Sequence, residues 1–552
     1  MKLKNILYSM MMGTAVLTGT TSCVSDLDQY PHTETTSKDV YTSLANYEAV
    51  LGKIYAAMVT SGQGKGGDNK DMESVLNNGS GFDYMRMFIN MQECGTDEFA
   101  STWLTGEQTT GLTYLSWDAN DAWVSDMYYR IYYNIVLCNE FLRNANSASF
   151  SGADAEKMKE YKAEVRFMRA LFYYHALDFY RNIPMVTEND PVGSFIPPRY
   201  TPQQTFDYIE SELKDCVGDM LPASTCPYGQ ASQGAAYTLL AKLYLNSEVY
   251  TGVAKYAECK EACEKVMGMG YSLESDYSKL FNADNDKRTN EIIFALPVSA
   301  EHTVSWGSST YLVCGQVSMS NANQNVADYG VTAGWSEFRL RPEFVDKFSQ
   351  TDIDGNGDKR CKFFTNGQSK DVTSMTDEAT GYLSEKWSNL KDDKTTASNT
   401  ADAGVETDFP LFRLADVYLM YAECVARLGE DWDNWDGGSD AEAATRKEGA
   451  IYYINKVRER AYGDAEHNVW KDNFASDADF LQFILDERAR ELYHEGYRRT
   501  DLIRFGEFTT NKYIWQWKGG THDGQAVDNK YNIYPIPNTE LTANPNLHND
   551  NY

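Results

Sequence analysis

The chain has 552 residues, of which 42% are hydrophobic and 13% are aromatic, so it can bury a large core in one or two domains. Its 80 acidic and 50 basic residues give a formal net charge of −30. A surface of this charge repels phosphate backbones and anionic lipid headgroups, which argues against nucleic acid as a partner and favours a neutral ligand.

The amino terminus predicts export. Two lysines precede an apolar run at residues 6–17, which is too short to span a membrane and is typical of a secretory signal peptide over residues 1–22. Cys23 resembles the lipidated cysteine of a bacterial lipoprotein cleavage site, although Thr20 replaces the usual leucine. The acidic residues just after it resemble a surface-export tag of Bacteroidota lipoproteins. We expect Cys23 to anchor the protein by lipid; the alternative is a plain signal peptide with an incidental cysteine.

Apolar residues recur at steps of three and four over many stretches, which predicts helices. These stretches are residues 39–60, 119–145, 155–180, 202–218, 235–245, 256–266, 411–428 and 444–460. The apolar arc of 155–180 is too wide for a surface helix, so that helix is predicted to be largely buried. Its charged residues Glu164, Arg166 and Arg169 then need partners, and tying neighbouring helices together is favoured over a catalytic role.

Two later segments share a helix–turn–helix pattern. Residues 235–245 followed by 256–266 form one such pair, and 411–428 followed by 444–460 form the second. Alanine, leucine and tyrosine occupy their close-packing positions, as in tetratricopeptide-type hairpins, although the spacing is irregular. The pattern predicts a helical scaffold.

The region from about 285 to 408 differs from its surroundings. Helical periodicity fades there, Gly, Ser, Thr, Asn and Asp accumulate, and short strand-like runs such as 291–296 appear. We therefore predict a mainly α fold in one domain over 23–552. Tetratricopeptide-like hairpins form a scaffold over 39–284 and 409–510, and residues 285–408 form a loop-rich, partly β subdomain that binds the ligand.

Other motifs are incomplete. His494 and Glu495 begin an HExxH zinc pattern, but Arg498 stands at the second histidine position. The stretch at 352–358, DIDGNGD, has the spacing of a calcium loop but carries Phe363 where the bidentate glutamate belongs, so an acidic turn is preferred over a weak calcium site. The nine cysteines after the first are scattered without a disulfide or zinc pattern, so buried thiols are expected.

Four blocks carry a family resemblance. They are EVRFMRALFYYHALDFYRNIPMV at 164–186, LFRLADVYLMYAECVARLG at 411–429, ILDERARELYHEGYRRTDLIRFG at 484–506 and YPIPNTEL at 534–541. Together they resemble the SusD/RagB family, whose members are glycan-binding surface lipoproteins that sit as a lid on a SusC-like TonB-dependent transporter. GSSTYLVCG at 307–315 and FGEFTTNKYIWQWKGG at 505–520 are most similar to the starch-binding branch. The resemblance implies a binding protein without catalytic activity, held at the outer membrane.

In the starch-binding branch, an arc of aromatic rings cradles the curved glucan. Trp103, Trp306 and Trp335 match that arc. Flat indole rings on loops suit the apolar C–H faces of pyranoses, and a bend among them favours a helical α-glucan. The alternative is that these tryptophans are packed in the core.

The polar groups of the arc match less closely. Arg86 matches a sugar-contacting arginine, and its acidic partner is left open between Asp83 and Asn78. The branch has further ring and amide groups where this chain has Ser101 and Gly106.

A structural calcium ion is also implied by the resemblance. The matching positions are Asp286, Glu406 and Asp408. Oxygen ligands of this kind suit calcium, but three acidic residues on loops are equally typical of ordinary surface, and both interpretations stay open.

Two other functions are left open. A glycoside hydrolase acting on α-glucans needs only two carboxylates at a set separation, which spacing in the sequence cannot exclude. A helical-repeat scaffold that binds proteins would instead use its concave helical surface, with the tryptophans as packing.

Overall fold

The computed structural model describes residues 37–552 apart from 65–69, 78–81, 194, 400–403 and 433–448. Contacts divide the chain into one unit over residues 1–47 and a second over 48–552. In the first unit, helix α2 (Ser37–Val40) is followed by the start of α3 (Leu44–Ala56), which continues into the second. Among the described residues, no helix has the length and apolar character needed to cross a bilayer.

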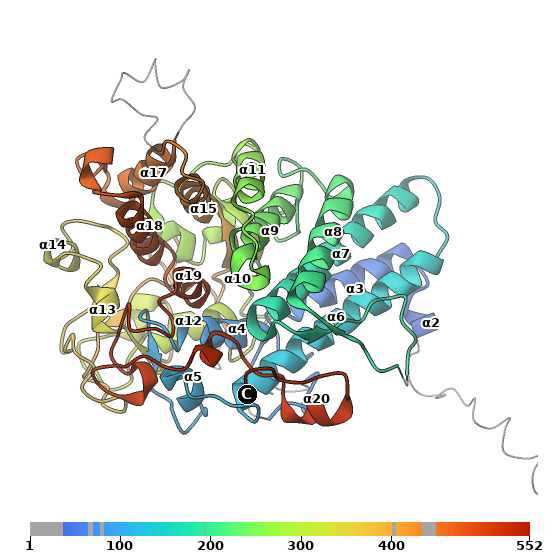
Figure 1. Cartoon of the computed structure of the whole chain (residues 1–552), viewed down its shortest axis with the longest axis horizontal. Helices are drawn as coiled ribbons and strands as arrows, with labels where there is room; N and C mark the ends of the chain where they lie inside the picture. The colour runs from blue at the N-terminus through green and yellow to red at the C-terminus, as the bar shows by residue number, and fades with distance from the viewer. Residues whose placement is uncertain (1–36, 65–69, 78–81, 194, 400–403, 433–448) are drawn as a thin grey trace, which may run out of the picture. The chain divides into compact units, whose positions relative to one another are not determined.

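Helices dominate the second unit, which confirms the mainly α prediction (Figure 1). Up to residue 267 they are α4 (Tyr84–Glu93), α5 (Thr110–Tyr114), α6 (Ala122–Ser147), α7 (Ala153–Tyr180), α8 (Pro202–Cys216), α9 (Gln233–Leu245), α10 (Ser247–Thr251) and α11 (Tyr256–Met267). The later ones are α12 (Ser308–Gly315), α13 (Pro342–Val345), α14 (Gln350–Ile353), α15 (Leu414–Arg427), α17 (Ala450–Tyr462), α18 (Asp477–Leu492), α19 (Arg498–Arg504) and α20 (Asn538–Ala543).

The strands pair antiparallel in two-stranded sheets. The pairs are β1 (Ala100–Ser101) with β5 (Phe338–Arg339), β2 (Ile183–Pro184) with β3 (Arg199–Tyr200), β4 (Ile292–Leu296) with β8 (Phe409–Arg413), and β6 (Phe363–Phe364) with β7 (Leu383–Ser384). The prediction of a helix from residue 411 is wrong at its start, because 409–413 pair with β4 and the helix begins only at Leu414. A short apolar run that is buried on every side fits either structure by its pattern.

Helix α7 is buried as predicted. Every residue from Phe167 to Tyr180 is buried, and the helix packs against α6 and α8. Arg166 and Arg169 each reach Glu212 on α8, with N–O distances of 2.8 and 2.7 Å, and Glu164 accepts a 2.7 Å hydrogen bond from Tyr55 of α3. The charged residues of α7 therefore tie neighbouring helices together, as predicted.

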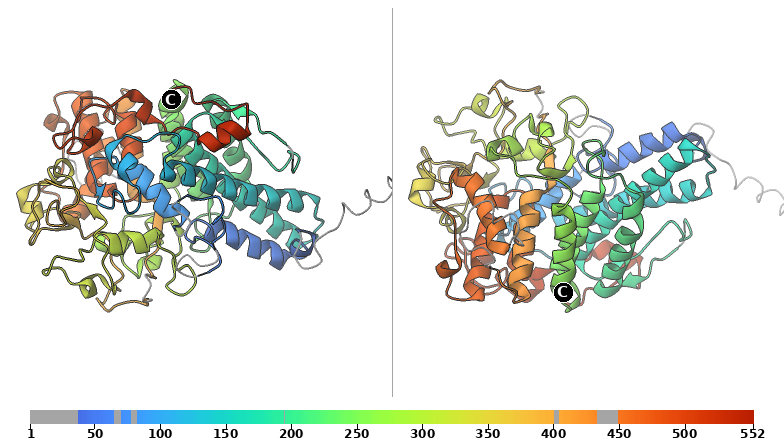
Figure 2. Two further views of the ribbon diagram at one scale, coloured as in Figure 1. Left: turned by 90° about the horizontal axis from the view of Figure 1, so that it is seen from below. Right: turned by 90° about the horizontal axis from the view of Figure 1, so that it is seen from above.

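The predicted helical hairpins are present. Helix α9 packs against α11, α11 against α15, and α15 against α17 and α18. These helices run side by side in Figure 2, where the green pair meets the orange group. The scaffold is thus continuous across two segments that the sequence separates by the loop-rich region.

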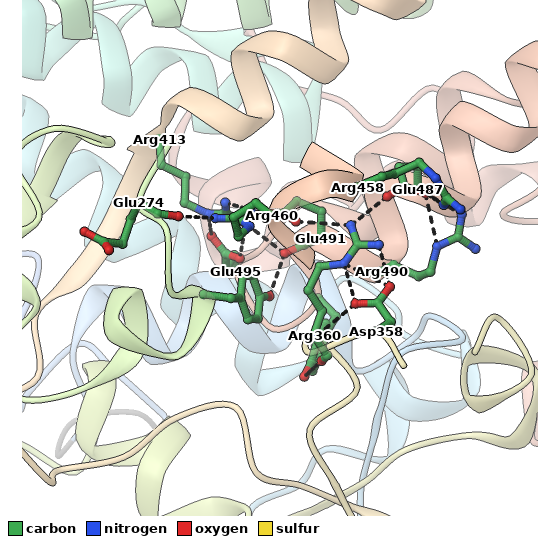
Figure 3. Close-up of polar contacts among 12 residues, drawn as sticks. Glu274, Asp358, Arg360, Arg413, Arg458, Arg460, Glu487, Arg490, Glu491 and Glu495 are labelled. Atoms are coloured by element: carbon green, nitrogen blue, oxygen red, sulfur yellow. Dashed lines mark hydrogen bonds and ion pairs between the residues drawn. The ribbon is translucent and has the colours of Figure 1, made fainter. Parts of the chain in front are cut away.

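A buried network of charges joins the second part of this scaffold to the loop-rich region (Figure 3). Arg413, at the end of β8, binds Glu495 at 2.7 Å and also contacts Glu491. Arg360, from the loop-rich region, binds Glu487 at 2.7 Å and Glu491 at 3.2 Å. All five side chains are fully buried. Burial alone would raise the pKa of Glu491, but the surrounding arginines lower that pKa to about 2.

Candidate functional site

Asp83 fixes the loop that carries Trp306. It caps the start of α4, and its two carboxylate oxygens accept hydrogen bonds from the backbone N–H of Ser308 (3.0 Å) and the hydroxyl of Ser305 (2.6 Å). A Cβ atom on Gly307 would lie 2.2 Å from the carboxylate, so only glycine fits there. The loop on either side of Trp306 is thereby clamped to α4.

A second set of hydrogen bonds joins the segments that carry Trp103 and Trp335. Thr102 donates its N–H to the carbonyl of Glu337 (2.7 Å) and its hydroxyl to the carbonyl of Ser336 (2.8 Å). This extends the pairing of β1 with β5 by one residue. The residue before Trp103 is therefore bonded to the two residues after Trp335.

The three predicted tryptophans lie partly exposed on these loops. The ring centroids of Trp306 and Trp335 are 6.1 Å apart, and the rings are inclined at 45°. By contrast, other tryptophans are fully buried: Trp117, Trp123, Trp387 and Trp515. The structure thus places the predicted rings at the surface and pairs two of them, instead of packing them in the core.

Arg86 lies beneath the rings and is 2% exposed. It donates a 2.8 Å hydrogen bond to the carbonyl of Trp306, and its guanidinium carbon is 5.9 Å from the ring centre of Trp335. It also binds Glu107 and lies 3.7 Å from Glu337. Burial alone would lower the pKa of Arg86, but the nearby carboxylates of Glu107 and Glu337 have the larger effect and raise it. Burial raises the pKa of Glu337 to about 7.

Asp83 and Arg86 therefore support the ring-bearing loops from inside the protein. Their contact with a sugar, which the resemblance implies, stays a prediction, because in this arrangement neither side chain reaches the surface. Asn78 and the lipidation candidate Cys23 lie outside the described residues. Sequence reasoning missed Glu107 as the partner of Arg86, because no local pattern links an acid after β1 to a helix in the preceding segment.

The predicted calcium ligands are electrostatic neighbours. Asp408 is buried and accepts the N–H of Val298 (2.7 Å), and Glu406 accepts the N–H of Ala300 (3.1 Å). Burial, with added repulsion from Asp286 and Glu406, raises the pKa of Asp408 to about 7. Their charge suits a cation, yet in the described parts of the chain no three His, Cys, Asp or Glu side chains approach closely enough to hold a metal ion. Calcium stays a prediction.

The remaining motifs have structural roles. In the acidic turn at 352–358, Asp352 accepts the N–H of Asp358 (2.7 Å), and Asp358 pairs with Arg360 (2.6 Å). These contacts give the stretch a structural role, and the choice between an acidic turn and a weak calcium site stays a prediction. Arg498, which replaces the second histidine of the zinc pattern, pairs with Asp97 at 2.6 Å.

Comparisons with known proteins agree with this architecture. One family model, described as the SusD family, matches residues 361–552, and another, described as starch-binding associating with outer membrane, matches 27–245. The starch-binding protein SusD of Bacteroides thetaiotaomicron is 32% identical, with 99% of each chain covered. The chain belongs to the SusD family. A further SusD-family relative, a SusD-like protein of Bacteroides ovatus, is 23% identical over 82% of this chain and 79% of its own.

Two solved structures of carbohydrate-binding proteins share the fold. A SusD-like carbohydrate binding protein from Bacteroides fragilis gives a TM-score of 0.70 at 19% identity, covering 92% of this chain and 100% of its own. Surface glycan-binding protein A from Bacteroides thetaiotaomicron, in complex with laminarihexaose, gives 0.66 at 17% identity, covering 92% and 99%.

Proposed function

We propose that this SusD-family protein captures a neutral glycan, namely starch or a related α-glucan, on the arc of Trp103, Trp306 and Trp335. The pairing of the partly exposed Trp306 and Trp335 rings carries the proposal. Pyranose faces stack on indole rings, and an inclination of 45° between adjacent rings suits a chain that bends. The resemblance to a starch-binding relative over the whole chain supports the choice of α-glucan.

The expected affinity is low. If each ring covers about 60 Å² of sugar, its burial is worth roughly 1.5 kcal/mol, so the three rings together contribute about 4.5 kcal/mol. This corresponds to a dissociation constant in roughly the millimolar range. Weak binding suits a protein that must release what it captures.

The arc has the features of a binding surface without chemistry. Glycoside hydrolysis needs two carboxylates that flank the scissile bond. Glu337 is fully buried under the rings, and both it and Glu107 are engaged with Arg86. These carboxylates neutralise an internal arginine and do not face a bound chain, which favours binding over hydrolysis.

The same proposal covers location and partner. A lipid on Cys23 would tether the protein at the outer membrane, and a SusC-like TonB-dependent transporter would receive the glycan. The signal-like amino terminus and the description of the matching family model support this assignment. Radiolabelled palmitate incorporation, lost in Cys23→Ser, tests the anchor, and co-purification from outer membranes tests the transporter.

Affinity electrophoresis of the chain without residues 1–23 tests the ligand, with amylopectin, pullulan, dextran and a β-glucan in the gel. We expect retardation by the α-1,4-linked polymers, and its loss in Trp306→Ala with an unchanged melting temperature. Trp470→Ala, which removes a tryptophan that is 38% exposed elsewhere, is the matched control. Retention of binding by Trp306→Ala, or shortening of maltoheptaose on incubation, would overturn the proposal.

A further inference from the structure

A second cavity lies in the loop-rich part of the chain, separate from the tryptophan arc. Its volume is about 360 Å³, within the range of small-molecule sites. Its lining combines one aromatic ring of a strand with carboxamides from the loop after α12, among them Phe364, Asn323, Gln324 and Asn325. None of the three arc tryptophans lines it.

The pairing of β6 with β7 directs Phe364 to this cavity. Successive residues of a strand face opposite sides. Phe363 packs into the core, where its ring centre is 5.8 Å from that of Phe344 and 5.1 Å from that of Phe348. Phe364 therefore faces away from that core, and it is partly exposed beside the cavity. An aromatic ring placed in this way offers a flat apolar platform.

The polar wall of the cavity is held in place by a chain of hydrogen bonds. The hydroxyl of Tyr329 donates to Glu385 (2.6 Å) and accepts from the side-chain amide of Gln324 (2.9 Å). The carbonyl oxygen of that amide accepts the N–H of Ser318 (2.6 Å). Tyr329 and Gln324 are 6% and 8% exposed. Their polar groups are thus fixed before any ligand arrives, which lowers the entropy lost on binding.

Charges of both signs line the cavity, so it has no strong preference for an ion. Lys362 and Lys394 lie with Asp328 and Glu385 in the lining. A further lining lysine, Lys386, is buried and pairs with Glu495 outside the cavity. A neutral ligand rich in hydroxyl groups fits such a lining better than an anion or a cation does.

We propose that this cavity is a second carbohydrate site, which takes one or two pyranose units of a neutral sugar. Phe364 lies under the apolar face of a ring, and the carboxamides of Asn323 and Asn325 bind its hydroxyls, since a carboxamide both donates and accepts hydrogen bonds. The small volume limits the site to a chain end or a short oligosaccharide.

The second site shares a loop with the arc. The segment that begins at Ser318, which is bonded to the cavity wall, continues to Met319, whose N–H donates to the hydroxyl of Ser336 (2.7 Å). Ser336 directly follows Trp335. The loop thus lies between the two sites and is bonded to both, but the ligand groups of each site are different residues.

Saturation-transfer-difference NMR with maltose and with cellobiose tests the proposal. The triple variant Trp103→Ala/Trp306→Ala/Trp335→Ala removes the arc and should still show saturation transfer to at least one of the two sugars. Adding Phe364→Ala should weaken that remaining binding at least tenfold. Loss of all transfer in the folded arc variant, or transfer that Phe364→Ala leaves unchanged, would overturn the second site.

A variant of an exposed residue tests the site in case Phe364→Ala does not fold. Asn323 is exposed, so Asn323→Ala should leave the melting temperature unchanged and weaken the remaining binding, whereas Asn366→Ala on a neighbouring loop should not. Equal binding by these two variants would count against the site. The result is independent of the arc, because Phe364→Ala in the otherwise native protein should leave retardation by amylopectin intact.

Discussion

The scaffold and the arc use charged and aromatic residues in opposite ways. Arg413 of the scaffold and Arg360, which reaches the scaffold from the loop-rich region, are both fully buried and pair with buried glutamates. In the arc, Trp306 and Trp335 keep part of their surface in solvent, and a buried Arg86 supports them from below. Buried ion pairs therefore fix the arrangement of the helices and strands, whereas the exposed aromatic rings are available to a ligand.

Arg413→Met tests the role of the buried ion pairs and should have the largest effect. Removing one partner leaves buried carboxylates without compensation, and we expect a loss of about 3 to 5 kcal/mol in the free energy of unfolding. Urea denaturation measures this loss. The control is Arg143→Met, which removes a half-exposed pair with Glu140 (2.7 Å) and should cost less than about 1 kcal/mol. Similar losses in the two variants would show that the buried network does not hold the scaffold.

Glu164→Gln tests a buried carboxyl that no arginine compensates. Burial raises the pKa of Glu164 to about 7, against which the hydrogen bond from Tyr55 acts only in part. Because the pKa is raised on folding, the stabilising proton is fully present below pH 4.5 and is lost as the pH rises through 7. Unfolding at a series of pH values should show the variant gaining up to about 3 kcal/mol relative to the native protein between pH 4.5 and 8. A difference that does not vary with pH would refute the assignment.

Calcium provides a test at the edge of the scaffold. If an ion binds at Asp408, calcium at about 100 times its dissociation constant should raise the free energy of unfolding by about 2.7 kcal/mol. Thermal unfolding with calcium and with EGTA measures this effect. Asp408→Asn should remove it, whereas Asp354→Asn, in the acidic turn, should not. If calcium leaves the melting temperature of the native protein unchanged, the proposed calcium site is wrong.

The smallest expected effect is the coupling between the two paired tryptophans of the arc. Trp306 and Trp335 contact each other, so their substitutions by alanine should not add in glycan affinity. A double-mutant cycle should give a coupling of about 0.5 to 1.5 kcal/mol. Calorimetry with maltoheptaose measures it. Strictly additive losses would mean that the two rings act on the sugar separately.

The long helices that were predicted follow the helical period closely in their apolar residues, but the predicted stretches did not include α4 or α18. Helix α7 begins at Ala153, two residues before the predicted start, and ends at the predicted Tyr180. Strand β8 was missed, because a fully buried apolar run shows no alternation and continues directly into α15. Helix α12 was also missed, since it lies in a stretch whose glycine and serine content is typical of loops.

The site was predictable in part. The three tryptophans came from the resemblance, and the structure places all of them at the surface. The engagement of Arg86 with Glu337 was out of reach, because strand pairing brings together residues that lie far apart in the chain. The cavity at Phe364 was hidden for the same reason, since only the pairing of β6 with β7 shows which of two adjacent phenylalanines faces the core.

The pairing of β4 with β8 has a consequence for how this protein can diversify. Ile292 lies opposite Arg413, so the two ends of the segment between β4 and β8 lie side by side. The outer loops of the intervening segment can vary as long as its contacts with the scaffold are kept, among them Arg360 with Glu487, Lys386 with Glu495, and the ring of Phe344 on Tyr493. The loops that carry Trp306 and Trp335 can then change in sequence while the helical frame stays the same.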